Sequence, residues 1–167
     1  RDLQRLEAKN AIIKEHGMCK LSPHMKEKQT NRIFWTKQGK EKNKIAKQAS
    51  MQIKDGYNIM LDGSSSAYSM IPFLNEVRDL LVISNSAKVS YSLSETDIYN
   101  ISTGGKMIKG TTSFVGKEAI EAIKNYNADI VFFSCRGISE DGYLTDTNKE
   151  ENDVRKEMMK YADKKVA

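Results

Sequence analysis

The chain contains 167 residues, 39% of them apolar and 29% charged, the balance of an ordinary soluble protein with one main domain. No apolar run is long enough to cross a bilayer and no leader pattern marks the chain for secretion, so we expect a cytoplasmic protein with no membrane partner. Two distant cysteines and two histidines give no ligand spacing, so we expect neither a metal site nor a cofactor.

Positive charge is concentrated at the front of the chain. Residues 1–55 contain fourteen Lys and Arg against six Asp and Glu, a net charge of +8. The other 112 residues contain thirteen against sixteen, a net charge of −3. Such a basic segment either faces a polyanion or is a solvated linker, and charge alone does not choose between the two.

The front of the chain is predicted to form a helix, a hairpin and a linker, over residues 1–9, 11–21 and 22–37. Leu3 and Leu6 share one face of the helix, and Pro23 excludes a helix at the start of the linker. The chain starts inside the first helix and without Met, so we expect it to be a fragment of a longer protein.

Strands and helices alternate from residue 38 onward. The predicted strands lie at residues 57–62, 80–84, 97–103 and 128–133, and the second and fourth are the most apolar. The predicted helices lie around residues 45–53, 67–77, 87–93, 117–126 and 150–162, with a kink at Pro72. Continuous apolar strands that alternate with helices indicate an α/β fold of the Rossmann-like type, with a mostly parallel sheet covered by helices on both faces.

The loop after the first of these strands is the most informative segment. Asp62, Gly63, Ser64, Ser65 and Ser66 form a small-residue turn that leads directly into a predicted helix. Free backbone N–H groups and three hydroxyl groups at such a turn suit a phosphate. The alternative is that Ser65 or Ser66 only caps the helix. The position of the loop at the carboxyl end of a predicted central strand favours the anion site.

Three further strands end in small or polar residues at what we expect to be the same edge of the sheet. These ends are Ser84-Asn85-Ser86, Gly104-Gly105-Lys106 and Cys135-Arg136-Gly137. Small residues after strands are often only turn formers, so each strand end alone is weak evidence for a ligand site. The convergence of four such ends on one edge of the sheet is better evidence. Lys106 and Arg136 either contact an anionic ligand or lie on the surface, and the sequence leaves both possibilities open.

Ordered segments along nearly the whole chain resemble the DeoR family of bacterial sugar-metabolism repressors. They are Arg1-Asp2-Leu3, Leu6-Glu7, His16-Gly17, Lys42-x-x-Ile45-Ala46, Asp55-Gly56, Ile59-x-Leu61-Asp62, Ser64-Ser65-Ser66, Asn85-Ser86, Gly104-Gly105, Ser113-x-x-Gly116, Gly137-Ile138 and Thr147-Asn148-x-x-Glu151. The three serines stand where the family usually has Gly-Thr-Thr.

The resemblance implies a winged helix-turn-helix joined to a Rossmann-like sensor domain similar to ribose-5-phosphate isomerase. Residues 1–21 would then end the DNA-binding domain, residues 22–37 form the linker, and residues 38–167 form a C-terminally incomplete sensor domain. Such repressors release their operator when they bind a phosphorylated sugar. The implied partners are therefore a phosphosugar, operator DNA in the full-length protein, and further copies of the chain in a homo-oligomer.

The resemblance also implies two sets of contact residues. The DNA-contacting residues would be Arg1, Arg5, His16 and Gly17. The ligand cleft would consist of Asp62, Gly63, Ser64, Ser65, Ser66, Asn85, Gly104, Gly105, Glu151 and Arg155.

Three features depart from the family pattern. Arg136 stands where many members carry Asp, and Arg155 replaces a frequent lysine. The family also continues past the last helix into a strand and a lysine-bearing segment, and we expect this chain to stop before that strand. The first departure leaves the identity of the effector open.

The fold admits three classes of function: a phosphosugar-sensing repressor, a phosphosugar isomerase or deaminase, and an interaction module without a small ligand. An isomerase needs a positioned carboxylate base, for which Asp62 and Glu151 are candidates. Arg136 stands where an acidic residue is expected, and arginine is always protonated. The basic front segment is also superfluous for an isomerase, so we predict a repressor without enzymatic activity.

Overall fold

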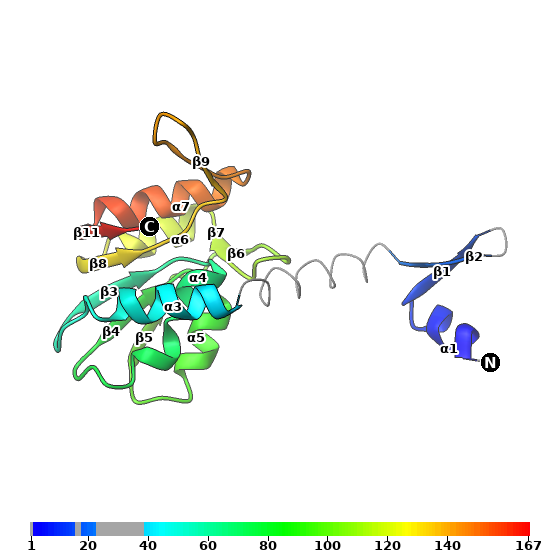
Figure 1. The fold of residues 1–167 in the computed structure, drawn as a ribbon, viewed down its shortest axis with the longest axis horizontal. Coiled ribbons are helices and arrows are strands. Elements are labelled where there is room, and N and C mark those ends of the chain that lie inside the picture. The colour runs from blue at the N-terminus through cyan, green and yellow to red at the C-terminus, as the bar shows by residue number, and fades with distance from the viewer. Residues whose placement is uncertain (1, 16–17, 23–38) are drawn as a thin grey trace. The chain divides into compact units, whose positions relative to one another are not determined.

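A computed structural model describes residues 2–15, 18–22 and 39–167 of the chain (Figure 1). The chain divides into two compact units, residues 1–39 and 40–167. In the first unit α1 (Asp2–Ala8) precedes an antiparallel hairpin of β1 (Ile12–Glu15) and β2 (Met18–Leu21). Helix α1 buries none of its residues, so the apolar face that predicts this helix is exposed.

The second unit is built on a five-stranded sheet in which all neighbouring strands run parallel, in the order β11-β8-β3-β4-β5. The strands are β3 (Asn58–Leu61), β4 (Leu81–Ser84), β5 (Tyr99–Ser102), β8 (Ala128–Phe132) and β11 (Ala162–Val166). The central strand is β3, as the apolar run before the serine loop predicts.

Helices cover both faces of this sheet (Figure 1). One face carries α3 (Gly39–Ser50), α4 (Ser65–Tyr68), the 3-10 helix η1 (Ile71–Phe73) and α5 (Ala87–Leu93). The other carries α6 (Lys117–Ile123) and α7 (Lys149–Lys160). A hydrophobic core lies between the sheet and the helices on each face. Ile59 and Leu61 of β3 pack into the core on the α3 side and Met60 into the core on the α7 side, as the alternation of side chains along a strand requires. The Rossmann-like α/β prediction is confirmed.

Two short antiparallel hairpins extend from the sheet's connections. One pairs β6 (Lys106–Met107) with β7 (Phe114–Val115), and the other pairs β9 (Gly137–Ile138) with β10 (Leu144–Thr145). Strands of two residues leave almost no periodic signal in a sequence. None of these four strands was therefore among the predicted elements.

Three expected elements differ from the structure. The helix predicted over residues 67–77 is replaced by α4 and η1, because Pro72 has no backbone N–H with which to continue a helix. The last helix ends at Lys160, and Ala162 is buried as the first residue of a strand. The expectation that the chain stops before this strand was therefore wrong, since β11 is present.

Candidate functional site

The carboxyl ends of the parallel strands meet at one edge of the sheet. Leu61 is in register with Ser84 on one side and Phe132 on the other, and Ser84 is in register with Ser102. The residues that follow the strands therefore lie along the same edge. They are Asp62, Asn85, Thr103 with Gly104, and Phe133 with Ser134.

The serine loop begins at this edge and turns immediately into α4. Ser64 caps the helix, because its hydroxyl accepts a hydrogen bond from the Ala67 N–H at 3.1 Å. Ser65 and Ser66 do not perform that role. The backbone N–H of Ser64 donates to Asp62 Oδ1 at 3.0 Å, which holds the loop in its turn. The cap therefore falls on Ser64, and the capping role does not account for Ser65 or Ser66.

A lysine that the sequence analysis did not include in the site reaches this loop. Lys42, on α3, places its Nζ 2.7 Å from the hydroxyl oxygen of the buried Ser65. Lys42 precedes the buried Ala46 by four residues, so it lies on the inward face of α3. That spacing is the signal that distinguishes it from the exposed Lys40 and Lys44.

Asp62 and Arg155 form a buried ion pair beside the loop. Arg155 Nε lies 3.1 Å from Asp62 Oδ2, and the side chains are 12% and 4% exposed. The same carboxylate oxygen accepts the Ser134 N–H at 3.2 Å. Burial raises the pKa of Asp62, and the Arg155 charge followed by the hydrogen bonds from Ser64 and Ser134 acts against this rise.

The network continues outward from Arg155 across the start of α7. Arg155 Nη1 donates to Asn152 Oδ1 at 2.7 Å and lies 3.4 Å from Asp146 Oδ2. Arg136 Nε lies 3.4 Å from the other oxygen of Asp146. The structure therefore brings Arg136 and Arg155 to one carboxylate. The side chain of Arg136 is 56% exposed and lies at the outer end of the network.

The connection after β5 also touches α7. Lys106 Nζ contacts Glu150 at 2.6 Å, and Thr111 Oγ1 donates to Glu151 Oε1 at 2.6 Å. The predicted site residues Lys106 and Glu151 are thus each engaged by a neighbour from the other segment. Thr111 and Glu150 were not among the predicted site residues.

Asn85, which directly follows β4, is almost fully buried. Its amide Nδ2 donates to the Phe114 carbonyl at 2.9 Å, whereas Oδ1 has no hydrogen-bond partner within the described residues. Ser113 Oγ is likewise buried without a partner in the described part of the chain. A Cβ atom at Gly63 would lie 2.0 Å from that hydroxyl, so residue 63 must be glycine for the loop to pack here.

The two glycines after β5 differ in their surroundings. Gly105 has a φ of +107°, and a Cβ there would lie 2.7 Å from the Val115 carbonyl oxygen. Gly104 has a φ of +62° with open space around it. Close packing against the start of α6 therefore explains Gly105, whereas only the positive φ favours glycine at residue 104.

Residues 37–167 match the family model described as the DeoR C-terminal sensor domain. The chain belongs to the DeoR family. It is 33% identical to the HTH-type transcriptional repressor GlcR of Bacillus subtilis, over 100% of this chain and 64% of that protein. It is 28% identical to the L-fucose operon activator of Escherichia coli, over 97% of this chain and 68% of the relative.

The DeoR-family sensor domain also resembles solved enzymes in fold. Ribose 5-phosphate isomerase A from Methanocaldococcus jannaschii superposes with a TM-score of 0.53 and 19% identity, over 74% of this chain and 49% of the other. This likeness concerns the fold alone. The chain spans about two thirds of the length of the DeoR-type regulators that it matches.

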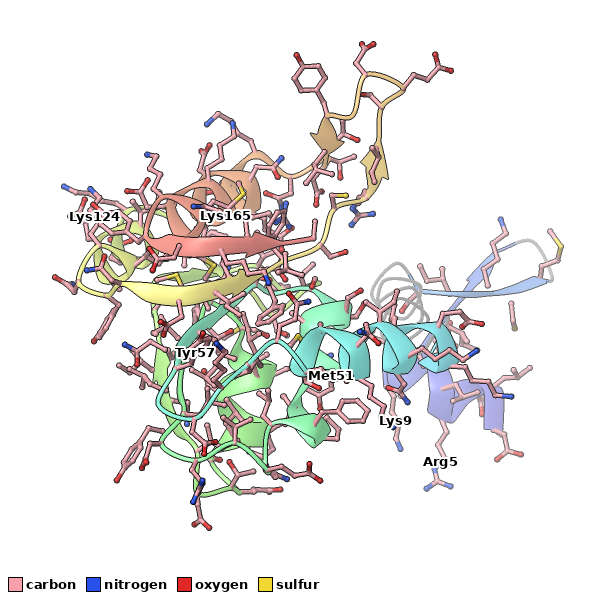
Figure 2. All side chains as sticks on the ribbon, turned by 60° about the vertical axis from the view of Figure 1, so that its left-hand side comes forward. Arg5, Lys9, Met51, Tyr57, Lys124 and Lys165 are labelled. Atoms are coloured by element: carbon pink, nitrogen blue, oxygen red, sulfur yellow. The ribbon has the colours of Figure 1, made fainter. Side chains whose placement is uncertain are left out.

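The predicted DNA-contacting residues of this DeoR-family chain lie in the first unit. Arg5 is exposed on α1, and Figure 2 shows its side chain extending away from the helix, as does that of Lys9. Arg1, His16 and Gly17 lie outside the described residues. No described helix is both long enough and apolar enough to span a membrane. Across the described segments, no cluster of His, Cys, Asp or Glu has the makings of a metal site.

Proposed function

We propose that this chain is the sensor portion of a transcriptional repressor of sugar metabolism, and that a phosphorylated sugar binding at the serine loop alters operator binding by the full-length protein. The named relatives support a regulator, and one of them carries a sugar operon in its name. Residues 1–21 then end the DNA-binding domain, residues 22–37 link it to the sensor, and the regulator acts in the cytoplasm.

The contact between Lys42 and Ser65 carries this proposal. An ammonium group and a buried hydroxyl lie 2.7 Å apart at the carboxyl edge of a parallel sheet. Ligands of such folds bind at this edge. A phosphate oxygen that contacts both groups from the side would accept hydrogen bonds from both, and the bond from the ammonium group is charge-assisted and so stronger than a neutral one. The loop hydroxyls of Ser64 and Ser66 stand on either side of this contact in the sequence.

The polar groups beside the loop suit the sugar portion of the ligand. Asp62, Arg155 and Asn152 form a hydrogen-bonded network of fixed donors and acceptors. Gly104 and the carboxyl edge of β4 with Asn85 border the same region of the sheet. Hydroxyl groups can both donate and accept, so a polyol fits a surface of this kind.

The carboxylates of the site support sensing rather than catalysis. Both oxygens of Asp62 already accept hydrogen bonds, from Ser64 on one side and from Ser134 and Arg155 on the other. Glu151 accepts from Thr111. A general base for an isomerase has to be free to take a proton from the substrate. A phosphosugar isomerase or deaminase is therefore the second candidate, favoured only by the fold.

A thermal-shift screen of phosphorylated sugars, each paired with its unphosphorylated form, tests the proposal. We expect one or more phosphosugars to raise the melting temperature, the paired sugars to have no effect, and no turnover of the stabilising compound. Turnover would support the isomerase instead. A chain that responds to no compound in the screen would contradict the sensor.

The matched variants for this screen are Ser65→Asp and Ser94→Asp. A carboxylate at residue 65 would pair with Lys42 and repel phosphate, so the thermal response should disappear while the fold is retained. Ser94 is exposed at the far end of α5, so the same change there should leave the response intact. A normal response from Ser65→Asp would place the phosphate elsewhere.

A further inference from the structure

A small cavity lies at the carboxyl edge of the sheet on the side covered by α7, and it has a volume of about 260 Å³. Phe133 lines this cavity and directly precedes Ser134, whose N–H donates to Asp62 Oδ2. Arg155, the ion-pair partner of Asp62, lines it as well. The cavity therefore belongs to the same site as the serine loop, whereas Lys42 reaches that loop from α3 on the other face of the sheet (Figure 1).

The charged side chains around this cavity do not neutralise one another. Asp62 is paired with Arg155. Asp146 lies 3.4 Å from a nitrogen of Arg155 and 3.4 Å from a nitrogen of Arg136, so two carboxylates face two guanidinium groups. Lys156 also lines the cavity, is exposed to solvent, and has no ion-pair partner among the described residues of the sensor unit. One positive charge is therefore left over at this end of the site.

The surroundings of this charge favour an anionic ligand group over a neutral one. Part of the cavity lining is apolar and consists of Phe133, Leu144 and Met159. A low local dielectric strengthens the attraction between opposite charges. The contact of Arg136 with Asp146 is also longer than the 2.7–2.9 Å that is typical, at about that range, of charge-assisted hydrogen bonds, and the Arg136 side chain is 56% exposed. A sugar hydroxyl would leave the charge of Lys156 unmatched, whereas a carboxylate or phosphate group would pair with it.

We propose that the effector carries a second anionic group at the end remote from the phosphate in the serine loop, and that Arg136 and Lys156 bind this group at the cavity. The proposal rests on the function proposed above, because it concerns the same effector. A water molecule takes up about 30 Å³ in the liquid, so the cavity has room for a carboxylate or a phosphate group. The effector therefore belongs to the sugar bisphosphates or the phosphorylated sugar acids, which share this chemistry.

Isothermal titration calorimetry of the chain with matched sets of three compounds tests this proposal. Each set contains a sugar monophosphate, the bisphosphate of the same sugar, and the sugar acid that carries the same single phosphate. In at least one set, we expect a compound with two anionic groups to bind at least about tenfold more tightly than the monophosphate. A preference for the bisphosphate would identify the second group as phosphate, and a preference for the sugar acid would identify it as carboxylate.

Two variants test the residues that bind the second group. Lys156→Gln should weaken binding of the preferred compound at least about tenfold and leave binding of the monophosphate unchanged. Arg136→Gln should show the same selective loss, whereas a merely structural role would weaken both compounds alike. The matched control is Lys124→Gln, which removes the same charge from an exposed pair with Glu121 on α6 and should leave both affinities unchanged (Figure 2).

The possible failures of this experiment are distinguishable. Monophosphates that bind as tightly as their counterparts in every set would overturn the inference and leave the sensor function standing. Equal losses for both kinds of compound in Lys156→Gln and Arg136→Gln would do the same. A chain that binds no compound of any set would overturn both the sensor function and this inference.

Discussion

Lys42 and Ser65 are the residues on which ligand binding should depend most strongly. Three neighbouring lysines of α3 are exposed, whereas Lys42 is half-buried and directed at the loop 23 residues further along the chain. Sequence periodicity places it on the inward face of α3 but does not say what it meets there. The loop itself is readable from the sequence because all its parts are contiguous.

Replacing Lys42 by Met should weaken phosphosugar binding at least about tenfold. Hydrogen bonds to a charged group contribute about 1.5–3 kcal/mol, and about 1.4 kcal/mol corresponds to a factor of ten in affinity. Lys44→Met is the control, because it removes the same charge from an exposed position on the same helix. Titration calorimetry with the stabilising phosphosugar measures both. If both variants lost phosphosugar affinity equally, the loss would be due to the change in net charge and not to the contact of Lys42 with the ligand.

The ion pair of Asp62 and Arg155 should matter for stability. Arg155→Met leaves a buried carboxylate without its counter-charge, which costs about 3 kcal/mol of unfolding free energy in such pairs. The control is Arg78→Met, whose partner Asp55 is exposed and whose loss should change stability little. Urea unfolding at neutral pH distinguishes the two, and similar losses would contradict a buried pair.

The stability deficit of Arg155→Met should also depend on pH. Burial raises the pKa of Asp62 above 3.8 in the folded chain, and removing Arg155 takes away a charge that lowers it. A carboxyl group whose pKa is higher in the folded chain than in the unfolded chain stabilises the fold at pH values below its unfolded pKa. This contribution to the unfolding free energy is lost as the pH rises through the pKa of the folded chain. The deficit relative to the parent should therefore shrink as the pH falls and Asp62 becomes protonated in the folded variant. A deficit that stays constant as the pH is lowered would contradict this prediction.

At the scale of elements, the strands with continuous apolar runs were predictable and the charged one was not. Ile59, Met60 and Leu61 are buried on both faces of the sheet, which produces the unbroken apolar run in the sequence. The edge strand β11 reads Ala-Asp-Lys-Lys-Val, because charged residues protect an exposed edge from further pairing. Its composition therefore hides it from periodicity.

Gly105, in the connection from β5 to α6, is either required for packing or contacts the ligand, and a substitution distinguishes these two roles. Gly105→Ala should lose about 2–4 kcal/mol of stability, because a positive φ and a contact with the Val115 carbonyl both oppose a Cβ. Gly56→Ala has a similar φ of +79° in open space, so it should lose only about 1 kcal/mol. Thermal unfolding compares the two. A Gly105→Ala variant that is stable but insensitive to phosphosugar would instead make Gly105 a ligand-contacting residue.

At the scale of the whole molecule, the convergence of the strand ends was predictable and the links between them were not. Parallel strands bring Asp62, Asn85 and Gly104 to one edge whatever their side chains. The pairing of Asp62 with Arg155 joins residues 93 positions apart, and no local pattern encodes such a contact.

The sensor function proposed for this chain requires that the serine loop and Lys42 form a phosphate site. The direct measurement is a two-dimensional NMR titration of the isotope-labelled chain with inorganic phosphate and with a hexose phosphate. We predict that the largest shifts fall on the backbone amides of Ser64, Ser65 and Ser66 with both ligands, and that they vanish in Ser65→Asp. Shifts centred on other segments, with these three amides unmoved, would contradict the account.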